Sequence, residues 1–245
     1  MVVGATAVLG RGRAAALVAL TAAVAAYTAG AGSLWDATVW WDVAFFGFVL
    51  LPATFALAWL ALPLQGARGL LPVGLALAAL SVALYLADLD VAFNLVKLAA
   101  LVVLGFWFVA WFDAVSWVVL VAVIIPWVDV LSVWRGPTEY VVEQKPGVFD
   151  QISVAFREPG TDRSANLGPP DILFFALFLA AARRFDLRIG WTWAGMTAAL
   201  GATIALAVWT DASGLPALPA VCVGFLIPNA DLLWARLRNR AGNRR

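Results

Sequence analysis

Long apolar runs separated by short polar connections dominate this 245-residue sequence. A helix needs about 20 mostly apolar residues to cross the hydrocarbon core of a bilayer. Runs that approach or reach this length cover residues 14–31, 42–63, 69–87, 91–111, 114–134, 169–182, 189–210 and 215–234. Asp113 is the only strong break between residues 91 and 134, and two spans fit that stretch better than one very long span. We therefore predict an all-α, polytopic transmembrane helix bundle of about eight spans.

The composition supports residence in a membrane and excludes several kinds of chemistry. Hydrophobic residues make up 64% of the chain and charged residues only 13%, whereas an average soluble domain carries about 25% charged residues. Histidine is absent, and Cys222 is the only cysteine. The chain therefore cannot form a serine–histidine pair, an HExxH zinc site or a multi-cysteine metal site. We predict no cofactor and no metal, and carboxylates are the main groups left for acid–base chemistry.

Charged residues between the runs predict an orientation in the membrane. With eight spans, the short loops on one side hold Asp36, Asp88, Asp90 and Asp211 without any lysine or arginine. The other side collects the basic segments, which are Arg11 with Arg13, Arg68, the Arg183–Arg188 loop and the arginine-rich C-terminal tail. Because basic loops stay in the cytoplasm, both termini are predicted to be cytoplasmic, in an integral protein of a prokaryotic plasma membrane. The basic clusters adjoin apolar runs, so nucleic acid is not a predicted partner. The first run also fits a cleaved signal peptide.

The longest hydrophilic segment, residues 135–168, is predicted to lie on the outer side. Two strand-like stretches, Glu139–Val142 and Val148–Phe156, flank a turn at Lys145-Pro146-Gly147. A hairpin and a disordered linker fit this pattern equally well.

Two carboxylates and a proline motif lie inside or at the edge of apolar runs. Asp129 is late in the fifth run, and Asp171 is early in the sixth. Since these spans are antiparallel, a rise of about 1.5 Å per residue places both within roughly 10 Å of the outer boundary. Pro216-Ala217-Leu218-Pro219 begins the last run at the same level, and its prolines lack backbone donors. Irregular backbone at this depth is tolerated where it lines a wet cavity, so we predict that the three features converge there.

Two further polar residues, Asn94 and Lys97, interrupt the fourth run on its outer half. A lysine side chain inside a span tends to extend toward the water boundary. We therefore expect Lys97 to point toward Asp88 or Asp90.

Two facing carboxylates in a low-dielectric site share one proton, as in aspartic proteases. The ionised group takes a proton from water, and the protonated group polarises the scissile carbonyl. Alternatively, each aspartate pairs with an arginine, or Asp171 stabilises a helix N-terminus. A proton- or cation-coupled transporter or channel would also use intramembrane aspartates. We favour the protease interpretation because the pair coincides with the proline motif.

In this order and spacing, the residues resemble the presenilin and signal peptide peptidase family of intramembrane aspartyl proteases. That family carries an aromatic-Asp motif, a Gly-x-Gly-Asp motif and a Pro-Ala-Leu motif on three spans. Asp129 matches the first motif, Gly168 and Asp171 match the second, and Pro216-Ala217-Leu218 matches the third. Arg184-Phe185-Asp186 looks like the signal peptide peptidase branch. The resemblance covers residues 115–234.

The resemblance implies hydrolysis of peptide bonds within transmembrane helices, such as signal-peptide or membrane-protein remnants, in a lipid bilayer. The catalytic residues would be Asp129 and Asp171. An unwound substrate would add a strand to the 135–168 hairpin and contact the Pro-Ala-Leu backbone. The implied substrate-binding residues are Gly168, Pro169, Pro170, Pro216, Ala217 and Leu218. The chain would then divide into N-terminal transmembrane helices, residues 1–112, and a catalytic part, residues 113–245, that ends in the basic tail.

The sequence departs from the family pattern at three points. Val128 replaces the aromatic residue, Pro170 replaces the second glycine, and eight runs replace the usual nine spans. Proline cannot adopt positive φ and offers no N–H donor. The departure at Pro170 therefore raises a catalytically inactive homologue as an alternative.

Overall fold

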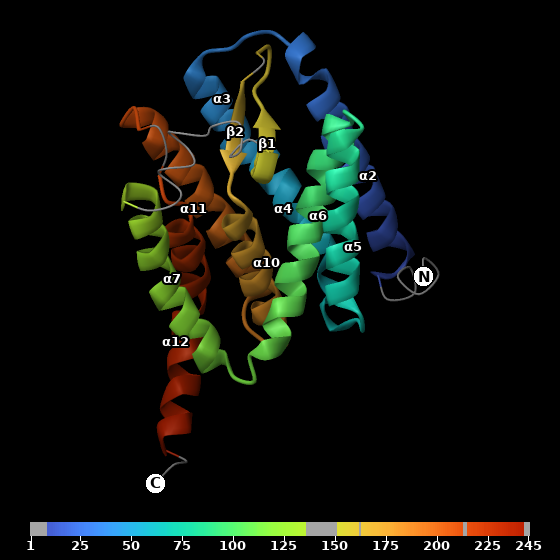
Figure 1. Cartoon of the computed structure of the whole chain (residues 1–245). Helices are drawn as coiled ribbons and strands as arrows, with labels where there is room; N and C mark the ends of the chain where they lie inside the picture. Colours follow the sequence, from blue (N-terminus) through green and yellow to red (C-terminus); the bar gives the residue numbers. More distant parts are fainter. Residues whose placement is uncertain (1–8, 136–150, 162, 213–214, 243–245) are drawn as a thin grey trace.

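Each predicted apolar run is helical in the computed structural model, which describes residues 9–135, 151–161, 163–212 and 215–242 (Figure 1). Its main helices are α2 (Arg11–Gly30), α3 (Val39–Phe45), α4 (Leu51–Ala61), α5 (Leu70–Leu86), α6 (Asp90–Phe108), α7 (Val115–Arg135), α10 (Pro169–Arg184), α11 (Ile189–Trp209) and α12 (Leu218–Gly242). A π-helical turn, Phe46–Leu50, joins α3 to α4, so the second run forms one continuous helical segment.

Six helical segments among the described residues are long and apolar enough to cross a membrane. They are Arg11–Ser33, Val39–Gly66, Asp90–Trp111, Val115–Trp134, Ile189–Trp209 and Leu218–Arg238. The helix breaks between Trp111 and Val115, so the long fourth and fifth runs form two segments, as predicted. The α5 helix is also apolar but has 17 residues, and α10 has 16. The chain is therefore an integral membrane protein built from helices.

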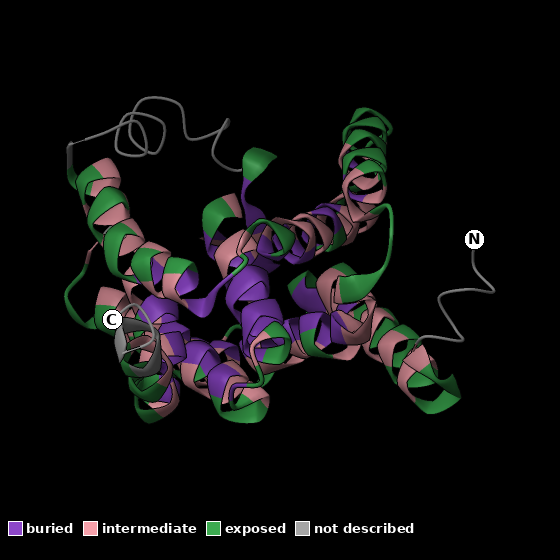
Figure 2. Ribbon diagram, turned by 90° about the horizontal axis from the view of Figure 1, so that it is seen from below, coloured by how far each residue is buried: buried purple, intermediate pink, exposed green. Residues whose placement is uncertain are grey.

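The short helix α10 lies in the middle of the bundle. Every residue from Phe175 to Ala182 is fully buried, and Figure 2 shows buried residues gathered along the centre, with exposed residues on the outer helix faces. Small side chains let α6 approach α10 closely: a Cβ atom on Gly105 would lie 2.6 Å from the Leu173 carbonyl oxygen. Close approach between helices through small residues is typical of membrane bundles. Because α10 is surrounded by other helices, it does not need the full length that a lipid-exposed helix needs to cross the bilayer.

An aromatic contact from α10 joins the two predicted parts of the chain. The ring of Phe175 stacks on Phe55 of α4 at 3.8 Å between centroids. Within the second part, Phe178 of α10 stacks on Phe225 of α12 at 4.8 Å. Such aromatic side chains bury large apolar areas and contribute strongly to a core. Residues 1–112 and 113–245 therefore share one hydrophobic core.

The connection between α7 and α10 contains a hairpin, but its strands differ from those predicted. β1 (Val154–Arg157) pairs antiparallel with β2 (Ser164–Leu167), with Val154 opposite Leu167. Of the predicted strand Val148–Phe156, the described residues 151–153 are not in a strand and Val154–Phe156 are, with β2 as their partner. Residues 148–150, the predicted partner Glu139–Val142 and the turn at 145–147 lie outside the described residues. Sequence pattern missed β2 because alanine and asparagine are depleted in strands, so tertiary contacts decide its conformation.

The two ends of the bundle carry different charges. At the end with the hairpin, Gly160 donates its N–H to the Ala31 carbonyl, which places the acidic α2–α3 connection beside the hairpin. At the other end, Arg184 donates to the Val109 carbonyl and Arg13 donates to the Trp59 carbonyl. Figure 1 shows that α2 begins and α12 ends toward this second end. The α2–α3 connection and the two arginines Arg13 and Arg184 therefore lie toward opposite ends of the bundle.

The basic C-terminal tail is not a separate element, because α12 continues through it to Gly242. Asn229 fixes this helix to the start of α11. Its Nδ2 donates to Thr192 Oγ1 at 2.7 Å, and its Oδ1 accepts the Arg188 N–H at 2.9 Å. Arg188 also forms a bidentate ion pair with Asp231, with both N–O distances 2.7 Å.

Replacing Asn229 by alanine should destabilise the protein by about 1–3 kcal/mol. Asn229 is fully buried, so its removal leaves the Thr192 hydroxyl and the Arg188 N–H without their partner. The unfolding midpoint in detergent would measure the loss. Asp231→Ala is the matched control, since it removes only a solvent-exposed ion pair from the same junction and should have a much smaller effect. Equal losses in the two variants would contradict this account.

Candidate functional site

Asp129 and the start of α12 meet through one hydrogen bond. The backbone N–H of Leu218 donates to Asp129 Oδ2 at 3.0 Å, across 89 positions of sequence. Leu218 is the first residue of α12, where backbone N–H groups have no intrahelical acceptor. Pro219 follows it and has no N–H to satisfy. The first and third motifs of the sequence analysis are therefore in direct contact.

Asp171 lies at the start of α10 and is 8% exposed. Its Oδ2 accepts the Gly168 N–H at 3.0 Å, and its own N–H donates to the Gly168 carbonyl at 3.1 Å. A carboxylate near a helix N-terminus also interacts favourably with the helix dipole. Asp171 thus stabilises the N-terminus of α10, which is the structural role that the sequence allowed for it. Its hydrogen bonds with Gly168 hold the side chain in one orientation.

The carboxylates of Asp129 and Asp171 lie close enough for their charges to interact. They come from α7 and α10, and Asp129 is half-buried whereas Asp171 is buried. Cys222, one turn into α12 and buried, also lies within electrostatic reach of Asp129. The structure therefore brings together the two aspartates and the proline motif, from three helices.

The α7 helix carries a proline, Pro126, one turn before Asp129. Proline removes the N–H that would otherwise bind the carbonyl four residues earlier, here that of Ala122. Val128, which replaces the family's aromatic residue, is 52% exposed on the outside of α7.

The expected substrate-binding residues occupy the two helix starts. Gly168 precedes α10 in an extended conformation, with φ −63° and ψ 150°. Pro216 and Ala217 precede α12 as half-buried irregular backbone, and Leu218 is buried. The backbone of the proline motif is thus irregular at Pro216 and Ala217, whereas Leu218 and Pro219 already belong to α12. Pro169 and Pro170 are the first two residues of α10.

Proline fits the structure at position 170, where the family that the sequence resembles has a glycine. The second residue of a helix needs no intrahelical N–H, and proline has the φ value that a helix start requires. Pro170 is exposed, and Gly168 beside it has negative φ. Neither residue therefore demands the positive φ that glycine would supply.

Pro170→Gly should preserve the fold and lower the free energy of unfolding by roughly 0.4–1 kcal/mol, because glycine makes the unfolded chain more flexible. The start of α10 should persist, because the hydrogen bonds between Asp171 and Gly168 do not involve Pro170. The measurements are the unfolding midpoint and the helix content in detergent. A much larger loss of stability or of helix content would show that the proline itself is required.

The hairpin connects directly to this site. β2 ends at Leu167, and the next residue is Gly168, which binds Asp171. Lys97 supports the preceding segment instead of extending toward Asp88 or Asp90: its Nζ donates to the Gln151 carbonyl at 3.0 Å. Asn94, one turn earlier on α6, binds Ala155 of β1. The sequence singled out Asn94 and Lys97 as polar residues within the fourth apolar run, but it did not predict which groups they bind.

No three acidic or cysteine side chains gather in a metal-binding arrangement within the described part of the chain. The titratable side chains that this site does bring together are the carboxylates of Asp129 and Asp171 and the thiol of Cys222. Comparisons with models of known families, with curated proteins and with solved structures find no match to this chain.

Proposed function

We propose that the protein is an intramembrane aspartyl protease of the presenilin-like kind, with Asp129 and Asp171 as its catalytic pair. The observation that carries this proposal is the contact between Asp129 and Leu218, with Asp171 close to the same carboxylate. Three short motifs, each weak alone, meet at one place in the bundle. Helix capping by Asp171 accounts for that residue alone and gives no reason for Asp129 to lie beside it.

The proposed reaction is general acid–base hydrolysis. One carboxylate takes a proton from a water molecule, and the other, protonated, donates a hydrogen bond to the scissile carbonyl. Attack of the water oxygen on the carbonyl carbon forms a tetrahedral intermediate. Transfer of a proton to the amide nitrogen breaks the C–N bond and leaves a new carboxyl and a new amine. The bonds from Leu218 and Gly168 hold the two carboxylates in fixed orientations.

The proposed substrate is a transmembrane helix that unwinds locally. A helical peptide bond hides its N–H and C=O in intrahelical hydrogen bonds, so an extended segment must form before attack. Such a segment satisfies its backbone by pairing with a strand. β2 is the strand that leads into Asp171, and the irregular backbone at Pro216 and Ala217 leads into Leu218, which binds Asp129.

We further propose that all eight apolar segments cross the membrane, with α5 and the buried α10 completing the six longer ones. The end that carries the arginines would then face the cytoplasm, together with both termini. The hairpin and the aspartate pair would lie toward the outer side. Labelling of cysteines introduced singly at exposed Trp35 and at Arg183, with a reagent that does not cross membranes, would test this orientation; labelling at Arg183 alone in intact cells would reverse it.

The test of function is cleavage of a tagged transmembrane peptide by purified protein in detergent and in liposomes. In water enriched in ¹⁸O, a directly activated water molecule puts the heavy isotope into the new C-terminal carboxyl, which mass spectrometry detects. Asp113→Asn is the matched control, because Asp113 is an exposed carboxylate in the α6–α7 connection and should not affect the rate. Proton or cation flux through liposomes without any cleavage would support a transporter and contradict the protease proposal.

A further inference from the structure

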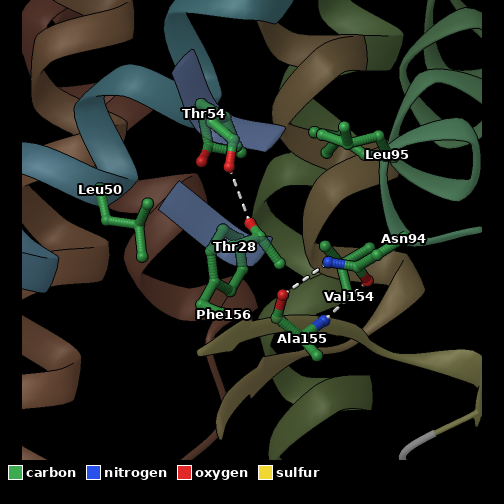
Figure 3. Close-up of a pocket in the computed structure, with 10 residues that line it drawn as sticks. Thr28, Leu50, Thr54, Asn94, Leu95, Val154, Ala155 and Phe156 are labelled. Atoms are coloured by element: carbon green, nitrogen blue, oxygen red, sulfur yellow. Dashed lines mark hydrogen bonds between the residues drawn. The ribbon is translucent and has the colours of Figure 1, made fainter. Parts of the chain in front are cut away.

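The outer edge of β1 is covered by a side chain from α6. Asn94 Nδ2 donates to the Ala155 carbonyl at 2.6 Å, and the Ala155 N–H donates to Asn94 Oδ1 at 3.0 Å. Figure 3 shows the Asn94 amide reaching the Ala155 backbone beside a small pocket that also contains Thr28 and Phe156. A side-chain amide carries the same donor and acceptor as a peptide group. Asn94 therefore occupies the place that one residue of a neighbouring strand would take.

Other contacts hold the same strand. The Tyr27 hydroxyl of α2 donates to the Arg157 carbonyl at 2.7 Å, and Lys97 holds the Gln151 carbonyl from one turn further along α6. Along β1, the backbone groups of every second residue face β2. Ala155 and Arg157 occupy the other positions, so their carbonyls point away from β2. A further strand thus cannot pair with β1 at these positions.

We infer that Asn94 is a positioning residue, which fixes the hairpin against α6 and so sets the position of β2 relative to the aspartate pair. This inference rests on the proposed protease function. β2 is the strand whose end runs through Gly168 into Asp171. A slip of one residue along a strand moves a peptide bond by about 3.3 Å and turns every side chain to the other face. The position of the hairpin therefore sets which substrate bond lies at the aspartate pair.

The contact requires both a donor and an acceptor at fixed length. Asn94→Asp keeps the shape but loses the donor toward the Ala155 carbonyl, and Asn94→Leu loses both groups. Asn94→Gln keeps both groups on a longer stem and should restore part of the function. Leu95→Met, the neighbouring residue on α6, is a volume-conserving control.

The first measurement is hydrogen exchange at individual backbone amides, which needs no protease activity. Exchange of the Ala155 amide should accelerate at least about tenfold in Asn94→Leu, which removes the acceptor of this N–H, and less in Asn94→Asp, which keeps an acceptor oxygen. The Glu158 amide, which donates to the Arg163 carbonyl within the hairpin, is the internal control and should stay protected. Unchanged exchange at Ala155 would overturn the inference.

The second measurement is the position and kinetics of cleavage. We expect KM to rise about tenfold, kcat to change less than about threefold, and cuts to spread to neighbouring bonds, with partial return in Asn94→Gln. A purely structural role would lower the active fraction and leave KM and the cleaved bond unchanged, which would also overturn the inference. If the native protein cleaves nothing, the proposed function fails instead, and the exchange measurement alone then decides whether Asn94 holds the hairpin.

Discussion

Asp129→Asn and Asp171→Asn should each reduce cleavage of a transmembrane substrate by about a thousandfold or more. Asparagine removes the ionisable group but keeps an oxygen that can accept the Leu218 N–H in one case and the Gly168 N–H in the other. The fold should therefore survive while acid–base chemistry is lost. The measurements are initial cleavage rate and unfolding midpoint for the same preparations.

The double variant gives the sharper result. If the two carboxylates act as one unit, removing both should cost no more than removing one, because neither works alone. Alanine at either position should behave differently from asparagine, since it also removes a helix-start acceptor, which is worth about 0.5–2 kcal/mol of stability. Full activity in either asparagine variant would refute the catalytic pair.

Gly224→Ala should destabilise the protein by about 1–3 kcal/mol or more, although alanine is the better helix former. A Cβ atom at Gly224 would lie 2.4 Å from the backbone nitrogen and Cα of Met196 in α11, closer than real Cβ atoms approach. The approach is reciprocal, because a Cβ atom added at Gly195 would lie 2.7 Å from the Gly224 carbonyl oxygen. Pro228, four residues after Gly224 in α12, has no N–H to donate to the Gly224 carbonyl. At this crossing, α12 and α11 therefore pack with their backbones in contact.

The same substitution should also lower activity, because α12 carries Leu218 and a displaced helix loosens its bond to Asp129. Gly190→Ala is the matched control: it lies in α11, nothing lies within 4 Å of its added Cβ atom, and it should be neutral or slightly stabilising. Unfolding midpoints in detergent and cleavage rates would be compared for both variants. A Gly224→Ala protein as stable as the control would show that α11 and α12 can separate without cost.

Much of the helical framework could be predicted, because hydrophobicity is a local property that each run carries by itself. Boundaries were less predictable where polar residues continue a helix, as in the arginine-rich end of α12, or where an apolar strand starts late, as at Val154. β2 was not predictable, since Ser164-Ala165-Asn166-Leu167 has no strand pattern and becomes a strand only by pairing with β1. The same holds for Lys97, whose partner is the carbonyl of a residue 54 positions away.

The sequence alone determined that the chain is a helical membrane protein, that histidine and metal–thiolate chemistry are excluded, and that carboxylates at 129 and 171 are the unusual groups. The tertiary structure determined what those carboxylates touch. Whether Asp129 meets the amide of Leu218, and whether α10 lies at the centre, depends on helices packing through small residues such as Gly105 and Gly224. That packing is a relation between distant segments, and no local pattern of hydrophobicity encodes which faces come together.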